Sequence, residues 1–318
     1  MTGIETKQSI QQRYQEQLEQ AVNKAREHVH EGKVASYIPE LAKSDPNQLG
    51  AAIVLMDGTI INAGDTQTRF TLQSIAKLFS LAIALIDYGC DKVFSRVGME
   101  PTGDPFNSIM KLEAIKPHKP LNPMINAGAI AVCDMVKGYG CEEKMERILT
   151  LLRKMTANPK ICVNDSVYLS EKKSANRNRA LAYFMKDSGV LRSDVEETLD
   201  FYFRLCSIEV TTQDVAWMAS VLAADGAHPV TGERLIDTSI ARICKTFMVT
   251  CGMYNASGEF AIQVGIPAKS GVAGGIMASV PNMMGIGVYS PGLDEKGNSL
   301  AGVKLLRELS QMWHLSIF

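Results

Sequence analysis

The order of apolar segments along the chain restricts its fold most strongly. Residues 49–64 contain two apolar runs separated by Asp57-Gly58, a strong signal for a β-hairpin. Residues 260–290 are rich in glycine and apolar side chains, and Pro281-Asn282 divides them into strand, turn and strand. Residues from about 126 to 247 are mostly helical by periodicity. We therefore expect an α/β protein of the α+β kind, in which both chain ends build one antiparallel sheet with flanking helices and a large helical lobe beside it.

The length and the absence of linkers bear on domain organisation. The chain has 318 residues, of which 46% are hydrophobic, so it can bury a sizeable core. No repeat and no Ser/Gly/Pro-rich linker divides it. The sequence predicts a single domain, residues 1–318, with a sheet lobe of about 1–70 and 250–318 and a helical lobe of about 71–249.

The charge and hydropathy pattern excludes several classes of partner. The formal net charge is −1, so no overall attraction to nucleic acid or to an anionic membrane is expected. The longest strongly apolar run, residues 78–86, is too short to cross a bilayer. The polar N-terminal segment lacks the basic and apolar parts of a secretory signal. We expect a cytoplasmic protein with no nucleic-acid and no membrane partner.

Cysteine and histidine usage gives no sign of a metal site. The seven cysteines include no CxxC pair, and most stand among apolar neighbours, as in Ile161-Cys162-Val163. This pattern favours reduced, buried thiols. The five histidines form no ligand pattern such as HExxH, so no metal is expected.

A serine and a lysine three positions apart introduce the chemistry. Residues 70–88 are predicted to form a buried helix, on which Ser74 and Lys77 would share a face. Burial would lower the pKa of the lysine, which could then take the serine proton and create a nucleophile. The same spacing occurs in Ser108–Lys111 and Ser170–Lys173, so spacing alone is weak. Only Ser74 opens an apolar helix after a polar approach, which favours it.

A second element, Lys269-Ser270-Gly271, begins an apparent strand. A KSG or KTG strand about 200 residues after an SxxK helix is the pairing of penicillin-recognising serine enzymes. The glycine would let a substrate approach the strand, whose N–H groups could stabilise an oxyanion. Lys269 could equally be an edge-strand lysine that discourages aggregation. Spacing alone leaves both interpretations open.

Longer motifs occur in the order found in one enzyme family. They are LQSIAK (72–77), NPMINAGAI (122–130), LDFYFRLCSIEVT (199–211), CGMY (251–254) and AKSGVAGGI (268–276). With YIPELAK (37–43) and GNS (297–299), they closely resemble the serine-dependent glutaminases. The resemblance implies the fold of serine β-lactamases and transpeptidases. It also implies hydrolysis of L-glutamine to L-glutamate and ammonia without metal or organic cofactor, in a homo-oligomer (tetramer or dimer).

The resemblance assigns catalytic roles residue by residue. Ser74 matches the family nucleophile, and Lys77 matches its general base. Tyr254 matches a tyrosine that relays a proton to the leaving ammonia. The N–H groups of Ser74 and Val272 would hold the oxyanion.

The substrate-binding positions follow from the same resemblance. They are Tyr37, Ser74, Asn126, Glu171, Asn178, Tyr202, Tyr254 and Val272. Glu171 can pair with the ammonium of a free amino acid, while amides and hydroxyls can hydrogen-bond its carboxylate and its amide. Without the resemblance, the asparagines would be helix caps, Glu171 a solvated charge and Tyr202 a core aromatic. The chain departs from the family pattern at Asn176, where an acidic residue is frequent.

Two other functions share these elements. A β-lactamase or D,D-peptidase would use the same SxxK and KSG segments, but such enzymes act outside the cytoplasm. A binding homologue would keep the fold and lack a catalytic residue, whereas Ser74, Lys77 and Tyr254 are all present. Glutaminase activity is therefore the leading prediction.

Overall fold

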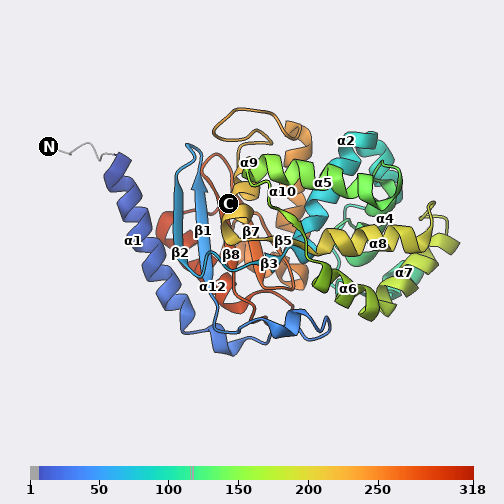
Figure 1. Cartoon of the computed structure of the whole chain (residues 1–318), viewed down its shortest axis with the longest axis horizontal. Coiled ribbons are helices and arrows are strands. Elements are labelled where there is room, and N and C mark those ends of the chain that lie inside the picture. The colour runs from blue at the N-terminus through green and yellow to red at the C-terminus, as the bar shows by residue number, and fades with distance from the viewer. Residues whose placement is uncertain (1–6, 115, 117) are drawn as a thin grey trace.

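The computed structural model describes residues 7–318 except 115 and 117, so the first six residues of the predicted sheet lobe lie outside the described part (Figure 1). The helices are α1 (Lys7–Arg26), α2 (Lys77–Arg96), α3 (Met110–Ala114), α4 (Asn126–Met135), α5 (Gly140–Thr156), α6 (Asp165–Ser174), α7 (Asn176–Asp187), α8 (Val195–Cys206), α9 (Thr212–Ala223), α10 (Thr238–Cys251), α11 (Ser257–Gln263) and α12 (Leu300–Trp313). Single 3-10 turns are η1 (Val29–Glu31), η2 (Leu41–Lys43), η3 (Gln73–Ala76) and η4 (Tyr254–Ala256). The strands are β1 (Gly50–Leu55), β2 (Ile60–Gly64), β3 (Phe70–Thr71), β4 (Cys162–Val163), β5 (Ile208–Val210), β6 (Ala268–Ser270), β7 (Gly275–Val280) and β8 (Met284–Tyr289).

The main sheet joins the two ends of the chain, as the sequence predicts. Its order is β2-β1-β8-β7-β6, and every neighbouring pair is antiparallel. Both predicted turns are present: Gly58 has a φ of 84° between β1 and β2, and Asn282 has a φ of 58° between β7 and β8. β1 and β8 pair directly, so the N-terminal and C-terminal hairpins form one continuous sheet.

Helices cover both faces of this sheet. Alternate β1 residues point in opposite directions: Ile53 belongs to the core with α1 and α12, whereas Val54 packs with Ala216 of α9. Helix α9 lies so close to β8 that a Cβ on Gly285 would come within 2.2 Å of the Ala216 carbonyl oxygen. Glycine at this position therefore allows the helix to lie directly on the sheet.

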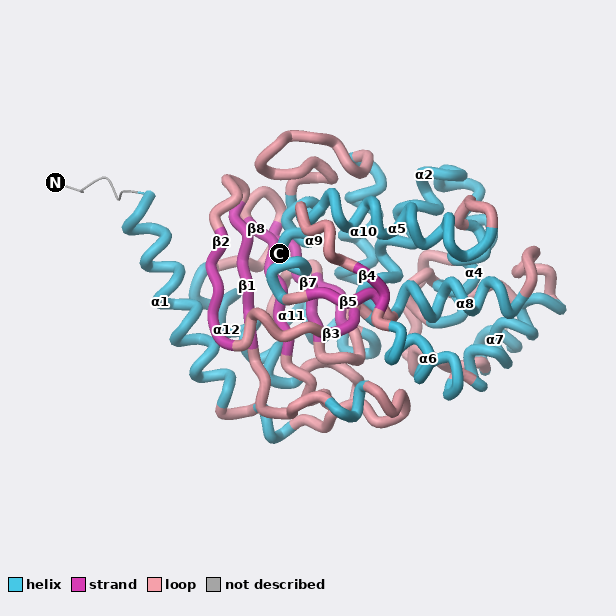
Figure 2. Tube along the Cα trace, in the orientation of Figure 1, coloured by secondary structure: helices cyan, strands magenta, loops and turns pink. Residues whose placement is uncertain are grey.

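The remaining helices gather beside the sheet. Figure 2 shows α2, α4, α5, α6, α7 and α8 together on the side away from β2. Side-chain caps fix where two of them begin: Asn164 accepts from the N–H of Val167 at the start of α6, and Asp194 accepts from that of Glu197 at the start of α8. Within the described residues, none of the helices has the length and apolarity to cross a membrane. The division into two lobes of one domain stays a prediction.

The prediction of one helix over residues 70–88 is partly wrong. Phe70 and Thr71 form β3, which pairs with β5 in a small sheet of order β3-β5-β4. Gln73 then has a φ of 49°, which an α-helix does not tolerate, so η3 intervenes before α2 starts at Lys77. Ser74 therefore lies on a tight turn between a strand and a helix. This turn is the frame of the site.

Candidate active site

Ser74 is presented by a strained turn. The left-handed φ of Gln73 immediately precedes it, and such backbone strain in a residue other than glycine clusters at functional sites. Ser74 is buried, with 7% exposure. In a 3-10 turn, side chains at i and i+3 eclipse, so η3 still directs Ser74 and Lys77 to the same side.

Lys77 is fully buried at the start of α2. Its Nζ donates to Met124 O at 3.0 Å and to Asn126 Oδ1 at 2.7 Å. Burial lowers the pKa of Lys77 to about 8, while the carboxyl of Glu171 acts in the opposite direction. A lysine with this pKa is partly neutral near pH 8 and can accept a proton. The contact with Ser74 Oγ that the spacing predicts stays a prediction.

Tyr254 comes from a distant part of the sequence and contacts Ser74. It opens η4 with a left-handed φ of 52°. Its hydroxyl donates to Ser270 O at 3.2 Å, and its ring lies 4.8 Å from that of Phe106. Burial raises the pKa of Tyr254 well above its usual value, although a hydrogen bond from Ser74 opposes this. Tyr254 is thus a neutral phenol within hydrogen-bond reach of the serine.

The Lys-Ser-Gly segment closes β6 instead of beginning a strand. β6 is an edge strand, yet Lys269 is fully buried. Its Nζ donates to Ser270 O at 2.7 Å and to Gly252 O at 3.2 Å, and lies 4.7 Å from the centre of the Tyr254 ring. The edge-protection interpretation of Lys269 is therefore wrong. The lysine joins the strand to the turn that carries Tyr254.

Gly271 and Val272 bring the end of β6 against the serine turn. A Cβ on Gly271 would lie 2.5 Å from the carbonyl oxygen of Leu72, two residues before Ser74. Gly271 itself donates its N–H to Gly275 O at 2.9 Å. Within the described residues, the N–H of Val272 has no hydrogen-bond acceptor. An unused N–H on this turn is suited to stabilising developing negative charge.

This close approach predicts a strong effect of Gly271→Ala. The methyl group would push the strand end away from the serine turn, and misplacement by about 1 Å can cost roughly a hundredfold in rate. We expect kcat for amide hydrolysis to fall by about tenfold to a hundredfold. Gly258→Ala is the control, because a Cβ there meets nothing within 4 Å. Equal kcat values in the two variants would contradict the close approach.

A buried carboxylate and two amides lie on the other side of Lys77. Asn126 begins α4, and its Nδ2 donates to Asn178 Oδ1 of α7 at 3.0 Å. Glu171 of α6 is buried, and burial raises its pKa to about 8 against the opposing effects of Lys77 and of a hydrogen bond from Gln73. Within the described residues, Glu171 Oε2 is buried without a hydrogen-bond partner. An orphaned carboxylate oxygen of this kind is suited to a cation from outside.

Tyr202 and Tyr37 complete the set. Tyr202 of α8 is buried in the helical core, as expected of a core aromatic residue. Its pKa is raised mainly by burial, then by Cys206 and by Glu171. Tyr37 is 56% exposed, but burial of its hydroxyl, with Tyr254 and Glu171 nearby, raises its pKa well above the usual value. Tyr37 therefore lies at the entrance of the site, near Tyr254 and Glu171.

A cleft leads to this cluster from outside. It has a volume of about 700 Å³, and Tyr37, Tyr254 and Val272 line it together with Phe106. Contacts link the predicted residues further inward, from Tyr254 to Ser74 and from Lys77 through Asn126 to Asn178. All the predicted site residues are thus brought to one place.

Some neighbours in the site were not predicted. Gln73 hydrogen-bonds Glu171, and Cys206 lies beside Lys77 and Tyr202. Both belong to the quoted motifs LQSIAK and LDFYFRLCSIEVT, which is the only signal that singles them out. In the described part of the chain, no group of three or more His, Cys, Asp or Glu residues is placed to hold a metal ion.

The prediction of buried cysteines holds for most but not all of them. The seven cysteines are free, and four are buried. Cys90 and Cys162 are exposed, so the prediction is wrong for these two. Cys162 lies on β4, an edge strand of the small sheet, and its apolar neighbours therefore do not cover it.

Comparison with known proteins agrees with this geometry. The sequence profile of the Glutaminase family matches residues 32–318. The chain belongs to the glutaminase family. Glutaminases hydrolyse the side-chain amide of glutamine, so the predicted activity and the amidohydrolase class are confirmed.

Relatives and solved structures extend the match over nearly the whole chain. A glutaminase of Geobacillus thermodenitrificans is 54% identical over 95% of this chain and 98% of its own length. Glutaminase 2 of Bacillus subtilis is 54% identical over 96% of this chain and 99% of its own. The structure of a probable glutaminase from Bacillus subtilis complexed with 6-diazo-5-oxo-L-norleucine has a TM-score of 0.88 at 40% identity, covering 100% of this chain and 99% of that one. The β-lactamase-like fold of the family is thereby confirmed for this chain.

Proposed function

We propose that this glutaminase acts through a γ-glutamyl ester on Ser74, with Lys77 as general base. One observation carries the proposal. Ser74 is buried in contact with Tyr254, and Lys77, three positions after Ser74, has a pKa lowered to about 8. The solved complexes support it, since one contains a Bacillus subtilis glutaminase in covalent complex with 5-oxo-L-norleucine. That structure has a TM-score of 0.88 at 42% identity, covering 96% of this chain and 99% of its own.

The proposed reaction has two halves. Neutral Lys77 takes the proton of Ser74, whose Oγ attacks the γ-carbonyl carbon of glutamine. The N–H groups of Ser74 and Val272 stabilise the tetrahedral oxyanion. Ammonia leaves with a proton supplied through Tyr254 or Lys77, and water then hydrolyses the ester by the reverse relay. The two halves use groups of the chain, the substrate and one water molecule.

The proposed substrate contacts lie beside Lys77 and along the cleft that leads to the site. The orphaned Oε2 of Glu171 would accept from the α-ammonium of glutamine. Asn126, Asn178 and the hydroxyls of Tyr37 and Tyr202 would hold the α-carboxylate and the amide. This supports a free amino acid as the substrate.

Glu171→Gln tests the substrate assignment. Loss of a charged hydrogen bond of about 1.5–3 kcal/mol should raise KM for L-glutamine by about tenfold to a hundredfold. The comparison substrate is glutaramate, the same amide without the α-ammonium, whose kcat/KM should stay unchanged. Steady-state ammonia release with both substrates measures the difference. An equal loss on both would contradict the pairing of Glu171 with the ammonium.

The same variant carries a pH prediction. In the unmodified chain, the pKa values of Lys77 and Glu171 are both about 8, so kcat/KM should rise with pH up to about 8, where the lysine becomes neutral and the carboxyl ionised. The Glu171 carboxylate raises the pKa of Lys77, so its removal lowers that pKa. The rising limb of Glu171→Gln should therefore move to lower pH. A limb that moves to higher pH would contradict the coupling of the two groups.

Two rival activities can be tested in parallel with the glutamine assay. A β-lactamase or D,D-peptidase would hydrolyse nitrocefin or become labelled by penicillin, whereas a binding homologue would show glutamine binding by calorimetry without ammonia release. We expect ammonia from L-glutamine and neither of the other results. Turnover of nitrocefin without release of ammonia from glutamine would overturn the proposal.

The proposal also covers the cellular compartment and the oligomeric state. We propose a cytoplasmic enzyme, which its seven free cysteines support because such thiols persist in reducing compartments. We also propose a homo-oligomer, a tetramer or dimer, on the strength of the family resemblance.

A further inference from the structure

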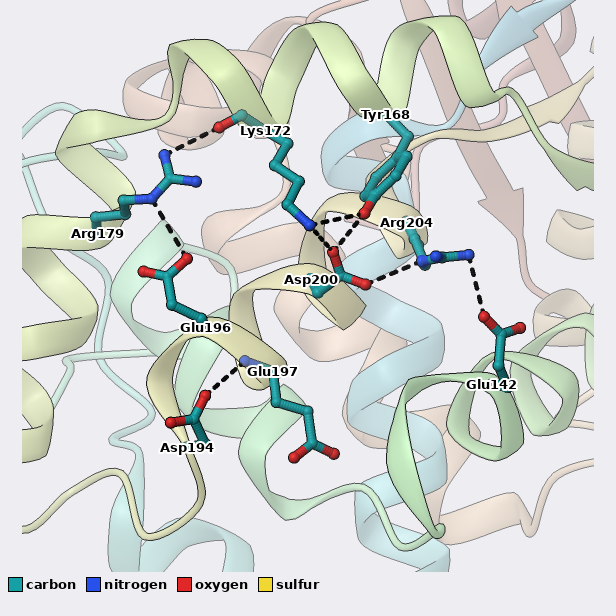
Figure 3. Close-up of polar contacts among 9 residues, drawn as sticks. All are labelled: Glu142, Tyr168, Lys172, Arg179, Asp194, Glu196, Glu197, Asp200 and Arg204. Atoms are coloured by element: carbon teal, nitrogen blue, oxygen red, sulfur yellow. Dashed lines mark hydrogen bonds and ion pairs between the residues drawn. The ribbon is translucent and has the colours of Figure 1, made fainter.

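Three residues proposed to bind substrate have close sequence neighbours in one polar network (Figure 3). The pairs of site residue and network residue are Glu171 and Lys172 on α6, Asn178 and Arg179 on α7, and Tyr202 and Asp200 on α8. The network joins these helices and reaches the hydrophobic core through the buried ring of Tyr168. Because its residues adjoin three proposed substrate residues, a change in the network can shift those residues.

Asp200 is the centre of this network. Its Oδ1 accepts from Lys172 Nζ and from the hydroxyl of Tyr168, both on α6. Its Oδ2 accepts from Arg204 Nε at 3.0 Å, and Lys172 Nζ also donates to the Tyr168 hydroxyl at 3.0 Å. Burial acts to raise the pKa of Asp200, but the hydrogen bonds from these three partners hold it below the usual value. One ionised carboxylate thus binds α6 to α8.

The network also reaches α5 and α7. Arg204 pairs with Glu142 in the first turn of α5 at 3.3 Å, and its guanidinium lies 4.8 Å from the centre of the Tyr168 ring. Arg179 of α7 donates to the carbonyl oxygen of Lys172 at 2.9 Å. The C-terminal end of α6 is therefore held from two sides.

Helix α6 has its apolar anchors in its first half. Of its ten residues, only Val167, Tyr168 and Glu171 are buried. Val167 and Tyr168 pack in hydrophobic clusters, whereas Glu171 has no hydrogen-bond partner for Oε2 within the described residues. The position of the second half of α6, which carries Glu171, therefore depends on the polar contacts of Lys172.

The network and the site occupy different sides of α8. Asp200 and Tyr202 are two positions apart, about 200° around a helix, so their side chains diverge. Tyr202 is 2% exposed and faces the site, whereas the Asp200 side chain is 19% exposed and faces α6. Asp200 therefore acts on the substrate only through the helices that it joins.

We propose that Asp200 is a positioning residue for recognition of the substrate α-ammonium: bound to Lys172 and Arg204, it fixes α6 against α8 so that Glu171 stays beside Tyr202. This inference rests on the proposed substrate roles of Glu171 and Tyr202. It assigns the network an effect on KM and on substrate selectivity that a purely stabilising ion pair does not have.

The test is Asp200→Asn, which keeps the shape of the side chain and removes its charge. We expect KM for L-glutamine to rise by about tenfold, as for a displaced binding group, with kcat changed less than about threefold. The kcat/KM for glutaramate, which has no α-ammonium, should stay within about twofold, so the selectivity for L-glutamine over glutaramate falls. Lys172→Met should reproduce the effect if Asp200→Asn fails to fold.

The matched control is Asp87→Asn in the same group of helices. Asp87 accepts from Arg147 Nη2 at 2.6 Å and from Arg147 Nη1 at 2.8 Å, and joins α2 to α5. It neighbours no proposed substrate residue in sequence. We expect this variant to lower Tm while the selectivity for L-glutamine stays unchanged.

The outcomes separate the two proposals. A selectivity loss in Asp200→Asn and not in Asp87→Asn supports the positioning role. A Tm loss in both variants with unchanged selectivity, while Glu171→Gln still raises KM, overturns the positioning role alone. An unchanged KM in Glu171→Gln overturns the assignment of Glu171, and the positioning role falls with it.

Discussion

Ser74→Ala is expected to abolish ammonia release from L-glutamine. The substitution removes the only oxygen that can form the γ-glutamyl ester in the proposed reaction, and loss of a nucleophile of this kind costs on the order of 10⁵- to 10⁶-fold in kcat. The oxyanion donors and the substrate contacts remain, so binding of glutamine should persist. A coupled glutamate dehydrogenase assay measures the rate, and calorimetry measures the binding.

Two controls make this result specific. Ser74 is buried at the protein interior, but its loss leaves no large cavity, so Tm should change by only a few degrees. Ser108→Ala removes the serine of another SxxK sequence and should keep full activity. Turnover by Ser74→Ala at more than about 1% of the parent rate would exclude Ser74 as the nucleophile.

Lys77→Met is expected to have the second largest effect. General-base catalysis contributes about 10²- to 10⁴-fold, and the nucleophile depends on this base, so kcat should fall by about 10³-fold or more. KM for L-glutamine should change less than kcat, although Asn126 loses the hydrogen bond that it accepts from Lys77. The pH profile of the residual kcat should lose the part of the rising limb near pH 8 that comes from deprotonation of Lys77.

The stability of the same variant has a predicted sign. Burial lowers the pKa of Lys77 from 10.5 to about 8 in the folded state. Its protonation therefore opposes folding fully below about pH 8, and this effect fades as the pH rises from 8 to 10.5. Methionine has a similar length and carries no charge. We expect Tm at pH 7 to stay the same or to rise while activity is lost. A large fall in Tm would attribute the loss of activity to unfolding instead of to the missing base.

The sequence predicts the architecture well, because apolar runs and turn residues are local signals. Asp57-Gly58 and Pro281-Asn282 mark the two hairpins, and the apolar runs beside them mark the strands. The pairing of β1 with β8 has no local signal. It is inferred because each hairpin requires a partner to bury its apolar face. The helical middle follows from its periodicity.

The details of the site are less accessible from the sequence. The left-handed φ of Gln73 follows directly on β3, which pairs with β5 about 140 residues away, and such a distant pairing leaves no local signal. The burial of Lys269 similarly depends on the carbonyl groups of Gly252 and Ser270. Family motifs identify these residues, but only the packed structure shows what holds them.

The network around Asp200 illustrates the same limit. In the sequence, Lys172 and Asp200 are ordinary helix-surface charges, 28 positions apart. The antiparallel packing of α6 on α8 turns them into a contact beside the site. Residues that position others therefore have no pattern of their own in a single sequence.

Peptide mapping after reaction with 6-diazo-5-oxo-L-norleucine tests the central claim most directly. This compound forms a covalent complex with a Bacillus subtilis glutaminase that is 42% identical to this chain. We predict one adduct per chain by intact mass, located on Ser74 and slowed in Lys77→Met. An adduct on another side chain, with Ser74 unmodified while ammonia release is lost, would contradict the account.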